Sequence, residues 1–274
     1  MPEGPEIRRL RNRLAEAIEG ETAQRIEFHL PRLTEWNGRL DGCHITAIES
    51  RGKALLTHID SGHSIYSHNQ LYGRWFVVPP GEPPDTRRQL RLAIHTRRYR
   101  ALLYSASDIE VWPTDQLSEH PFLKRLGPDV LDETTTTAMV LERLRDKAWW
   151  RRRLGGFLTD QSFVAGLGNY LRCEILFVAG LHPNQRPCDL DELQLARLAS
   201  AILELPRQSC ETGGITNDLT RAEALRASGA GFEEYRFHLF RRAGRRCYRC
   251  GTPIRFEKRG GQGCYYCPGC QKAS

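Results

Sequence analysis

Seven short β-type segments follow one another between residues 25 and 105, and turn-forming residues separate them. They are RIEFHL (25–30), CHITAI (43–48), ALLTHI (54–59), SIYSH (64–68), RWFVV (74–78), QLRLAIH (89–95) and RALLYS (100–105). These segments are too short and too frequent for a parallel α/β sheet, whose strands alternate with long crossovers. The pattern therefore predicts a β-sandwich, with the turn-rich segment 79–86 as a surface loop.

Helical periodicity opens the chain and returns after about residue 127. Apolar residues at 7, 10, 14 and 18 predict a helix over 5–18, which Gly20 ends. Further helices are expected over 134–146, 162–181 and 190–205. The segments 212–218 and 229–235 are rich in turn formers, and we expect a mobile loop among them.

A length of 274 residues fits two domains with a small appendage. The patterns predict an α+β multidomain fold with three parts. These are a β-sandwich domain with a leading helix over 1–127, a helical domain over 128–235 and a cysteine-rich module over 236–274.

The composition is that of a soluble globular protein, with 40% hydrophobic and 27% charged residues. No apolar run approaches the ~20 residues that a membrane span needs, and the first residues lack the apolar stretch of a signal peptide. The cysteine count of nine is odd, and together with the lack of an export signal it argues against disulfides. We therefore expect a cytoplasmic protein with no membrane partner.

The basic charge is concentrated near the end of the chain. Residues 241–260 carry eight Lys and Arg against one acid, a net +7 that equals the charge of the whole chain. Such a concentration favours a surface that faces phosphates over general solubility. A solvated basic tail is the alternative, but the same segment also holds paired cysteines.

Two CxxC pairs, Cys247 with Cys250 and Cys267 with Cys270, are separated by sixteen residues. This spacing is typical of four thiolates arranged tetrahedrally around one zinc ion. Four protein ligands leave no open position, so the predicted zinc ion is structural and would hold a β-hairpin over 255–266. The other five cysteines are expected to be structural residues: Cys43, Cys173, Cys188, Cys210 and Cys264.

The segment 160–177 predicts a phosphate-binding turn. Gly166 and Gly168 allow positive φ angles between two apolar, helix-compatible segments. The turn would expose backbone N–H groups at a helix N-terminus, where anions bind. Asn169 can donate its amide to the same phosphate, or it can simply cap the helix that follows.

The first residues, MPEGPEI, allow two interpretations. Pro and Glu are ordinary residues in a first helical turn. If Met1 is removed, however, Pro2 becomes a free secondary amine next to the Glu3 carboxylate, and the two can form a catalytic pair.

Six motifs together resemble the family that contains formamidopyrimidine-DNA glycosylase and endonuclease VIII. They are MPEGPEIRR (1–9), RGKALL (51–56), SHNQLYG (67–73), LYSASDIE (103–110), DQSFVAGLGNYLR (160–172) and the CxxC…CPGC end. The motifs occur in family order along the whole chain, and MPEGPE and SHNQLYG are similar to the endonuclease VIII branch. The resemblance implies a β-sandwich domain, a helix–two-turn–helix domain with a zinc finger, and DNA in the cleft between them.

The resemblance also implies that Pro2 is the nucleophile. Chemistry supports this role, because an α-amine has a pKa near ~7.7–8.0 whereas a lysine amine has one near ~10.4. Glu3 is then expected to protonate the ribose at O4′. Lys53 is expected to act as a general acid or cationic stabiliser, although by itself it reads as an ordinary lysine at a strand end.

Gln70, Leu71 and Tyr72 form a polar, apolar and aromatic tip between two predicted strands. Such a tip can wedge into duplex DNA and fill the space that an extruded nucleotide leaves. The alternative is that Leu71 and Tyr72 belong to the sandwich core.

The chain departs from the family at one zinc-finger position. The family has a phosphate-binding arginine five residues before the third cysteine, where this chain has Gln262. Glutamine can donate a hydrogen bond but lacks the charge and the bidentate fork of arginine. Arg259 is a candidate replacement. We expect weaker or altered processing, which Gln262→Arg would improve. An unchanged or lower rate would show that the site is filled in another way.

These observations predict a monomeric base-excision repair enzyme with one structural zinc ion. It would remove oxidised pyrimidines from double-stranded DNA and cut the strand at abasic sites by β,δ-elimination. The alternatives are an oxidised-purine glycosylase and a damaged-DNA-binding protein with weakened catalysis.

Overall fold

The computed structural model describes residues 2–81, 84–259 and 261–272, and the chain divides into two compact units. The first unit holds Pro2 and Glu6–Arg125, and the second holds Glu3–Pro5 and the chain from Leu126 onward. The further division of the second unit near residue 235 stays a prediction. None of the helices in the described ranges is long and apolar enough to cross a membrane.

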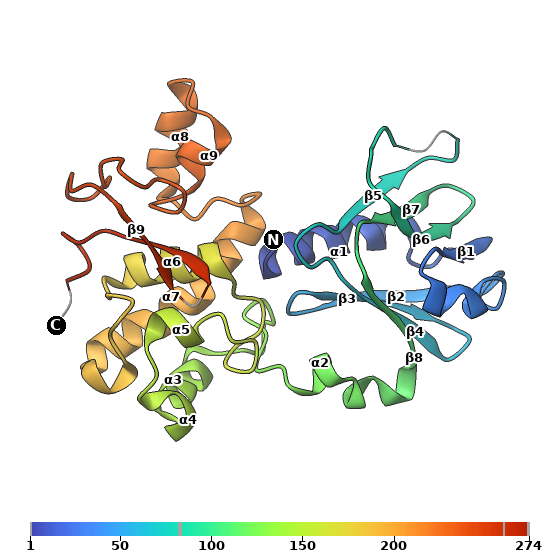
Figure 1. Ribbon diagram of the computed structural model, residues 1–274, viewed down its shortest axis with the longest axis horizontal. Coiled ribbons are helices and arrows are strands. Elements are labelled where there is room, and N and C mark those ends of the chain that lie inside the picture. Colours follow the sequence, from blue (N-terminus) through green and yellow to red (C-terminus); the bar gives the residue numbers. More distant parts are fainter. Residues whose placement is uncertain (1, 82–83, 260, 273–274) are drawn as a thin grey trace. The chain divides into compact units, whose positions relative to one another are not determined.

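The first unit is a β-sandwich of two four-stranded antiparallel sheets (Figure 1). One sheet has the strand order β1 (Arg25–Phe28), β6 (Leu90–His95), β7 (Arg100–Tyr104) and β5 (Arg74–Val78). The other has the order β2 (Ile45–Arg51), β3 (Ala54–Ile59), β4 (His63–His68) and β8 (Asp108–Pro113). The predicted β-sandwich is confirmed.

One strand, β8, was not predicted. Its apolar residues Ile109 and Val111 alternate with Asp108 and Glu110, which is the period of a strand with one buried face. Because two of the six residues of β8 are acidic, the strand does not form an apolar run.

Helix α1 (Gly4–Ile18) supplies Ile7, Leu14 and Ile18 to the sandwich core, and all three are 1% exposed. The spacing of these residues places them on one face of the helix, so that α1 buries an apolar stripe against strand residues. The first unit also contains the short helix α2 (Pro121–Lys124).

The second unit is helical and ends in a hairpin. Its helices are α3 (Thr137–Arg145), α4 (Lys147–Trp150), α5 (Leu154–Phe157), α6 (Asn169–Ala179), α7 (Glu192–Glu211), α8 (Leu219–Ala227) and α9 (Phe232–Arg236). The hairpin pairs β9 (Arg255–Arg259) with β10 (Gln262–Tyr266). Helices α6 and α7 build the centre of a core that also includes Phe157, Phe163 and Phe237.

Helix α6 begins seven residues later than the apolar pattern predicts. Gly166 has a φ of +101° and Gly168 is extended, so the chain turns there before the helix starts at Asn169. Helix α7 is longer than predicted and continues through Pro206 to Glu211. Periodicity alone does not show this turn, but the two glycines predicted it, and the prediction is confirmed.

Candidate active site and metal centre

The Glu3 carboxylate is bound by the N-terminus of helix α6. Gly168 N–H donates to Glu3 Oε2 at 2.7 Å, Tyr170 N–H to Oε1 at 2.8 Å and Leu171 N–H to Oε2 at 3.3 Å. Glu3 is only 3% exposed. The first N–H groups of a helix have no partners within it, and the helix dipole favours a negative charge there. Glu3 is therefore fixed in one position, and the prediction of a phosphate at this turn is wrong: its N–H groups bind a carboxylate of the chain itself.

Glycine is required at two positions of this turn. Gly4 N–H donates to the carbonyl oxygen of Gly166 at 2.8 Å, and the φ of +101° at Gly166 is one that other residues rarely adopt. A Cβ atom at Gly168 would lie 2.3 Å from Cδ of Glu3. The two glycines thus let the backbone turn approach the start of the chain closely.

Pro2 and Lys53 belong to the first unit. Pro2 is half-buried and lies just before α1. Lys53 occupies the two-residue turn between β2 and β3, where Gly52 has a φ of +59°, and it is 6% exposed. His68 pairs with Ala54 beside this lysine. Burial lowers the pKa of His68, and the positive charge of Lys53 contributes to the lowering.

The tip Gln70–Tyr72 connects β4 to β5 and is exposed. The exposed fraction is 57% for Leu71 and 67% for Tyr72, so the alternative that they belong to the core is wrong. Gln70 has a φ of +50°, and its Oε1 accepts a hydrogen bond from Ser107 Oγ at 2.9 Å. Gly73 N–H donates to Asn69 O at 2.7 Å and closes the turn. The tip presents two large apolar side chains on a constrained backbone.

Arg172 links Asn169 to Gln262 and is a site residue that the sequence motifs did not predict. Its guanidinium donates to Asn169 Oδ1 at 2.5 Å, to Gln262 Oε1 at 3.5 Å and to the carbonyl oxygens of Gly155 and Gly263 at 2.8 and 3.2 Å. Arg172 is 2% exposed. A buried arginine must be hydrogen-bonded, and the three-residue spacing from Asn169 on one helix was the available signal. Asn169 is the first residue of α6 and Gly168 is its N-cap, so the alternative that Asn169 caps the helix is wrong.

Arg259 is the last residue of β9 and pairs with Gln262 through the backbone. Its side chain lies outside the described part of the structure. Its proposed contact with DNA therefore stays a prediction.

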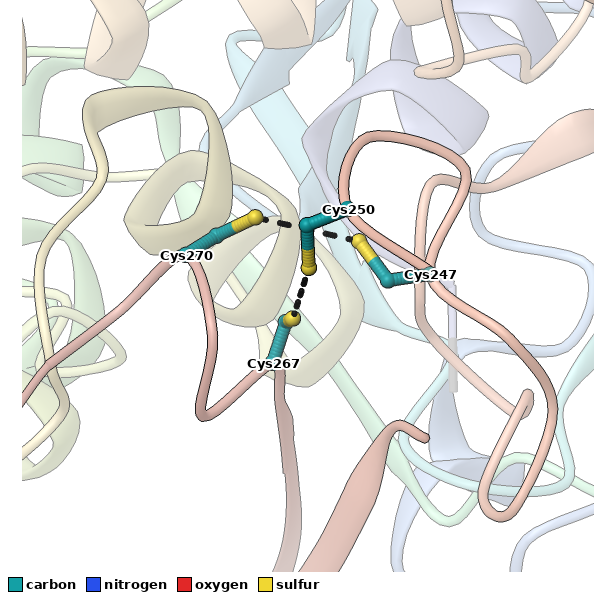
Figure 2. Close-up of side chains that lie close together, drawn as sticks. All are labelled: Cys247, Cys250, Cys267 and Cys270. Carbon is teal, nitrogen blue, oxygen red and sulfur yellow. Dashed lines mark hydrogen bonds between the residues drawn. The ribbon is translucent and has the colours of Figure 1, made fainter. Parts of the chain in front are cut away.

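The four cysteines of the two CxxC pairs converge (Figure 2). Their Sγ atoms all lie within 4.8 Å of one another, with Cys247 and Cys270 at 3.9 Å and Cys250 and Cys267 at 3.4 Å. Zinc–sulfur bonds of about 2.3 Å in a tetrahedron would separate the sulfurs by about 3.8 Å. The Thr252 side chain and N–H lower the pKa of the Cys250 thiol to about 6, whereas burial raises the pKa of the Cys267 and Cys270 thiols. The cluster can hold a metal ion.

Two family models match the chain. The formamidopyrimidine-DNA glycosylase N-terminal domain matches residues 1–107, and the H2TH domain of the same enzyme matches residues 126–220. The chain is 47% identical over 271 residues to proteins named endonuclease 8 from Escherichia coli and Shigella flexneri. In both cases the alignment covers 99% of this chain and 100% of the relative.

Solved structures of Lactococcus lactis Fpg share the fold. Its complex with DNA that contains an abasic site superposes with a TM-score of 0.82, and its complex with DNA that contains an oxidised pyrimidine superposes with a TM-score of 0.83. Both are 25% identical and cover 99% of this chain and 100% of that one. The two family models and the near-complete alignment to endonuclease 8 show that this chain belongs to the formamidopyrimidine-DNA glycosylase and endonuclease VIII family of DNA glycosylases with abasic-site lyase activity.

Proposed function

We propose that this chain removes oxidised pyrimidines from double-stranded DNA and then cuts the strand at the resulting abasic site. The observation that carries the proposal is the fixed Glu3 carboxylate, which three backbone N–H groups hold next to Pro2 in the chain. The 47% identity to endonuclease 8 and the fold shared with Fpg bound to damaged DNA support it.

Pro2 is the nucleophile in this proposal. After removal of Met1, its nitrogen attacks C1′ of the damaged nucleoside, the bond from C1′ to the base breaks, and the nitrogen loses its proton. The ring opens at O4′ and leaves an iminium ion. Since proline is a secondary amine, this iminium has no N–H proton to lose, and its positive charge persists. The charge acidifies the C2′ proton, whose loss expels the 3′ phosphate, and loss of the C4′ proton then expels the 5′ phosphate.

In this reaction Glu3 transfers a proton and Lys53 stabilises negative charge. Glu3 accepts hydrogen bonds through both oxygens, an arrangement that suits a carboxylate. It can take the proton that the Pro2 nitrogen releases and pass it to O4′. Lys53 is buried, so its ammonium would act in a medium where charge is weakly screened and would stabilise the departing base.

We infer that the metal ion of the cysteine cluster is zinc, because four thiolates in tetrahedral spacing are its preferred structural site. Replacing Cys250 by serine is expected to remove the ion and to lower the melting temperature by about 5–10 °C, since the hairpin would lose its anchor. Metal content by elemental analysis and calorimetry measure both effects. Cys188→Ser, which changes a cysteine outside the cluster, should change neither, and a Cys250→Ser protein with a full zinc complement would contradict the assignment.

Leu71 is proposed to fill the space of the extruded nucleotide. Truncation to alanine removes apolar surface that would be buried against the base stack, and we expect excision of a stacked oxidised pyrimidine to slow about tenfold. Nicking of a preformed abasic site should change less, because less stacking is lost there. Single-turnover rates on the two duplexes measure the difference. Leu71→Met, which keeps the size, should retain most of the rate; equal slowing of both reactions by Leu71→Ala would argue against a wedge.

Borohydride trapping tests the proposal as a whole. With a duplex that contains an abasic site, the enzyme should give a covalent protein–DNA band. Tight binding without a band would instead favour a non-catalytic damage-binding protein. Parallel excision assays on thymine glycol and 8-oxoguanine duplexes separate pyrimidine from purine specificity.

A further inference from the structure

A cavity of about 360 Å³ lies in the second unit at the start of the β10 strand. Its polar lining residues are Arg153, Thr159, Arg172, Asn184 and Gln262. No carboxylate lines it among the residues that the structure describes, and two of the lining residues are arginines. The cavity therefore offers donors and positive charge, which is the chemistry that binds an oxyanion.

Arg172 cannot supply this charge to a ligand freely. Its two terminal nitrogens donate to four protein oxygens, those of Asn169, Gln262, Gly155 and Gly263, and the side chain is 2% exposed. If this guanidinium turned toward a ligand, buried carbonyl oxygens would lose their hydrogen-bond donors. That loss would destabilise the folded protein. Arg172 thus acts as a positioning residue.

The contact with Arg172 fixes the orientation of the Gln262 side-chain amide. A guanidinium has only donors, so the atom of Gln262 that faces it must be the carbonyl oxygen. The amide NH₂ group must then point away from Arg172. The same reasoning applies to Asn169, whose Oδ1 also faces Arg172. Arg172 therefore leaves the NH₂ groups of both amides available to an acceptor.

Arg153 is the second arginine of the cavity, and unlike Arg172 its side chain is available to bind a ligand. It directly precedes α5 and is exposed, and its side chain makes no hydrogen bond or ion pair within the part of the chain that the structure describes. Its neighbour Arg152 is different, since it pairs with Asp160 at 3.3 Å and stacks on Trp149. Arg151 is also exposed but does not line the cavity.

We infer that this cavity binds one phosphodiester group of the DNA and that Arg153 supplies the charge that Gln262 lacks. The inference rests on the proposed function, because DNA is the source of the phosphate. Arg153 would bind the anion with its guanidinium while Gln262 donates through its oriented NH₂ group. Residues from two separate segments then share the task of a single hairpin arginine.

The first test compares Arg153→Gln with Arg151→Gln, which removes the same charge two residues away and outside the cavity. The probe is a duplex with a tetrahydrofuran abasic-site analogue, which the enzyme cannot cleave. We expect Arg153→Gln to weaken binding about 10- to 100-fold and to lower the slope of log Kd against log salt concentration by about 1. Arg153→Lys should recover the slope. Equal effects of Arg153→Gln and Arg151→Gln would overturn the inference.

The second test adds Gln262→Arg to both backgrounds. If Arg153 already fills the site, Gln262→Arg should change binding less than about threefold in the wild-type chain and should restore most of the loss in Arg153→Gln. The same gain in both backgrounds would overturn the inference. Titration with inorganic phosphate alone separates the two sources of the anion: phosphate binding that depends on Arg153 while DNA binding does not would also overturn it.

Failure of this inference can be told apart from failure of the proposed function. The same wild-type preparation is tested for borohydride trapping. A wild-type protein that traps abasic DNA while Arg153→Gln binds normally refutes only the phosphate site. A wild-type protein that does not trap refutes the proposed chemistry, and the binding comparison still stands on its own.

Discussion

A chain that carries one extra residue ahead of Pro2 is expected to lose both borohydride trapping and strand cleavage. The extra residue converts the proline nitrogen into an amide, which has no basic lone pair and cannot attack C1′. We expect the nicking rate on an abasic-site duplex to fall on the order of 10³-fold or more, as for the loss of other catalytic nucleophiles. Single-turnover nicking and the trapped band measure the loss.

Two control measurements show whether the extended chain still folds and still binds DNA. The melting temperature and the affinity for a tetrahydrofuran duplex should stay close to those of the wild-type chain. Intact-mass measurement shows whether Met1 is absent from the wild-type protein. An extended chain that nicks at the wild-type rate would assign the nucleophile to another amine.

Replacing Glu3 by glutamine is expected to slow base excision strongly and to spare trapping on a preformed abasic site. Glutamine cannot carry a proton to O4′, so excision should slow about 10²- to 10⁴-fold. The α6 N-terminus would also lose its anion, because the amide NH₂ group meets backbone N–H donors where the carboxylate accepted them. Excision and trapping are measured on the same preparation, and calorimetry reports the stability.

Glu6→Gln is the matched control, since Glu6 lies in the first turn of α1 and pairs with Arg9 at 3.4 Å. It should leave excision unchanged. Should Glu3→Gln excise an oxidised pyrimidine as fast as the wild-type chain, the proton must reach O4′ by another route.

Local sequence patterns predicted most of the fold. The strands of the sandwich are short apolar runs between turn formers, helix α1 repeats apolar residues at helical spacing, and the CxxC spacing indicated the metal centre. Strand β8 was missed because the acids Asp108 and Glu110 alternate with its apolar residues, so that it contains no apolar run. The apolar run over 162–181 does not show where α6 starts, whereas Gly166 and Gly168 predicted the turn that precedes it.

The candidate site was predicted in part. The family resemblance pointed to Pro2, Glu3 and Lys53. Turn chemistry pointed to the segment near Gly168, but its anion is the Glu3 carboxylate and not the predicted phosphate. The contacts of Arg172 with Gly263 and Gln262 join residues about ninety positions apart. Such contacts depend on how helix and hairpin pack, which a local pattern cannot show. Arg153 is likewise one of three consecutive arginines, and only the cavity distinguishes it.

The close approach of Gly168 to Glu3 has a consequence for how this protein can evolve. A methyl group at position 168 would occupy the space of the carboxylate, so the two positions form a single unit of variation although 165 residues separate them. A lineage that replaces Gly168 by a larger residue must also replace Glu3, because the Glu3 carboxylate would lose its place at the start of α6.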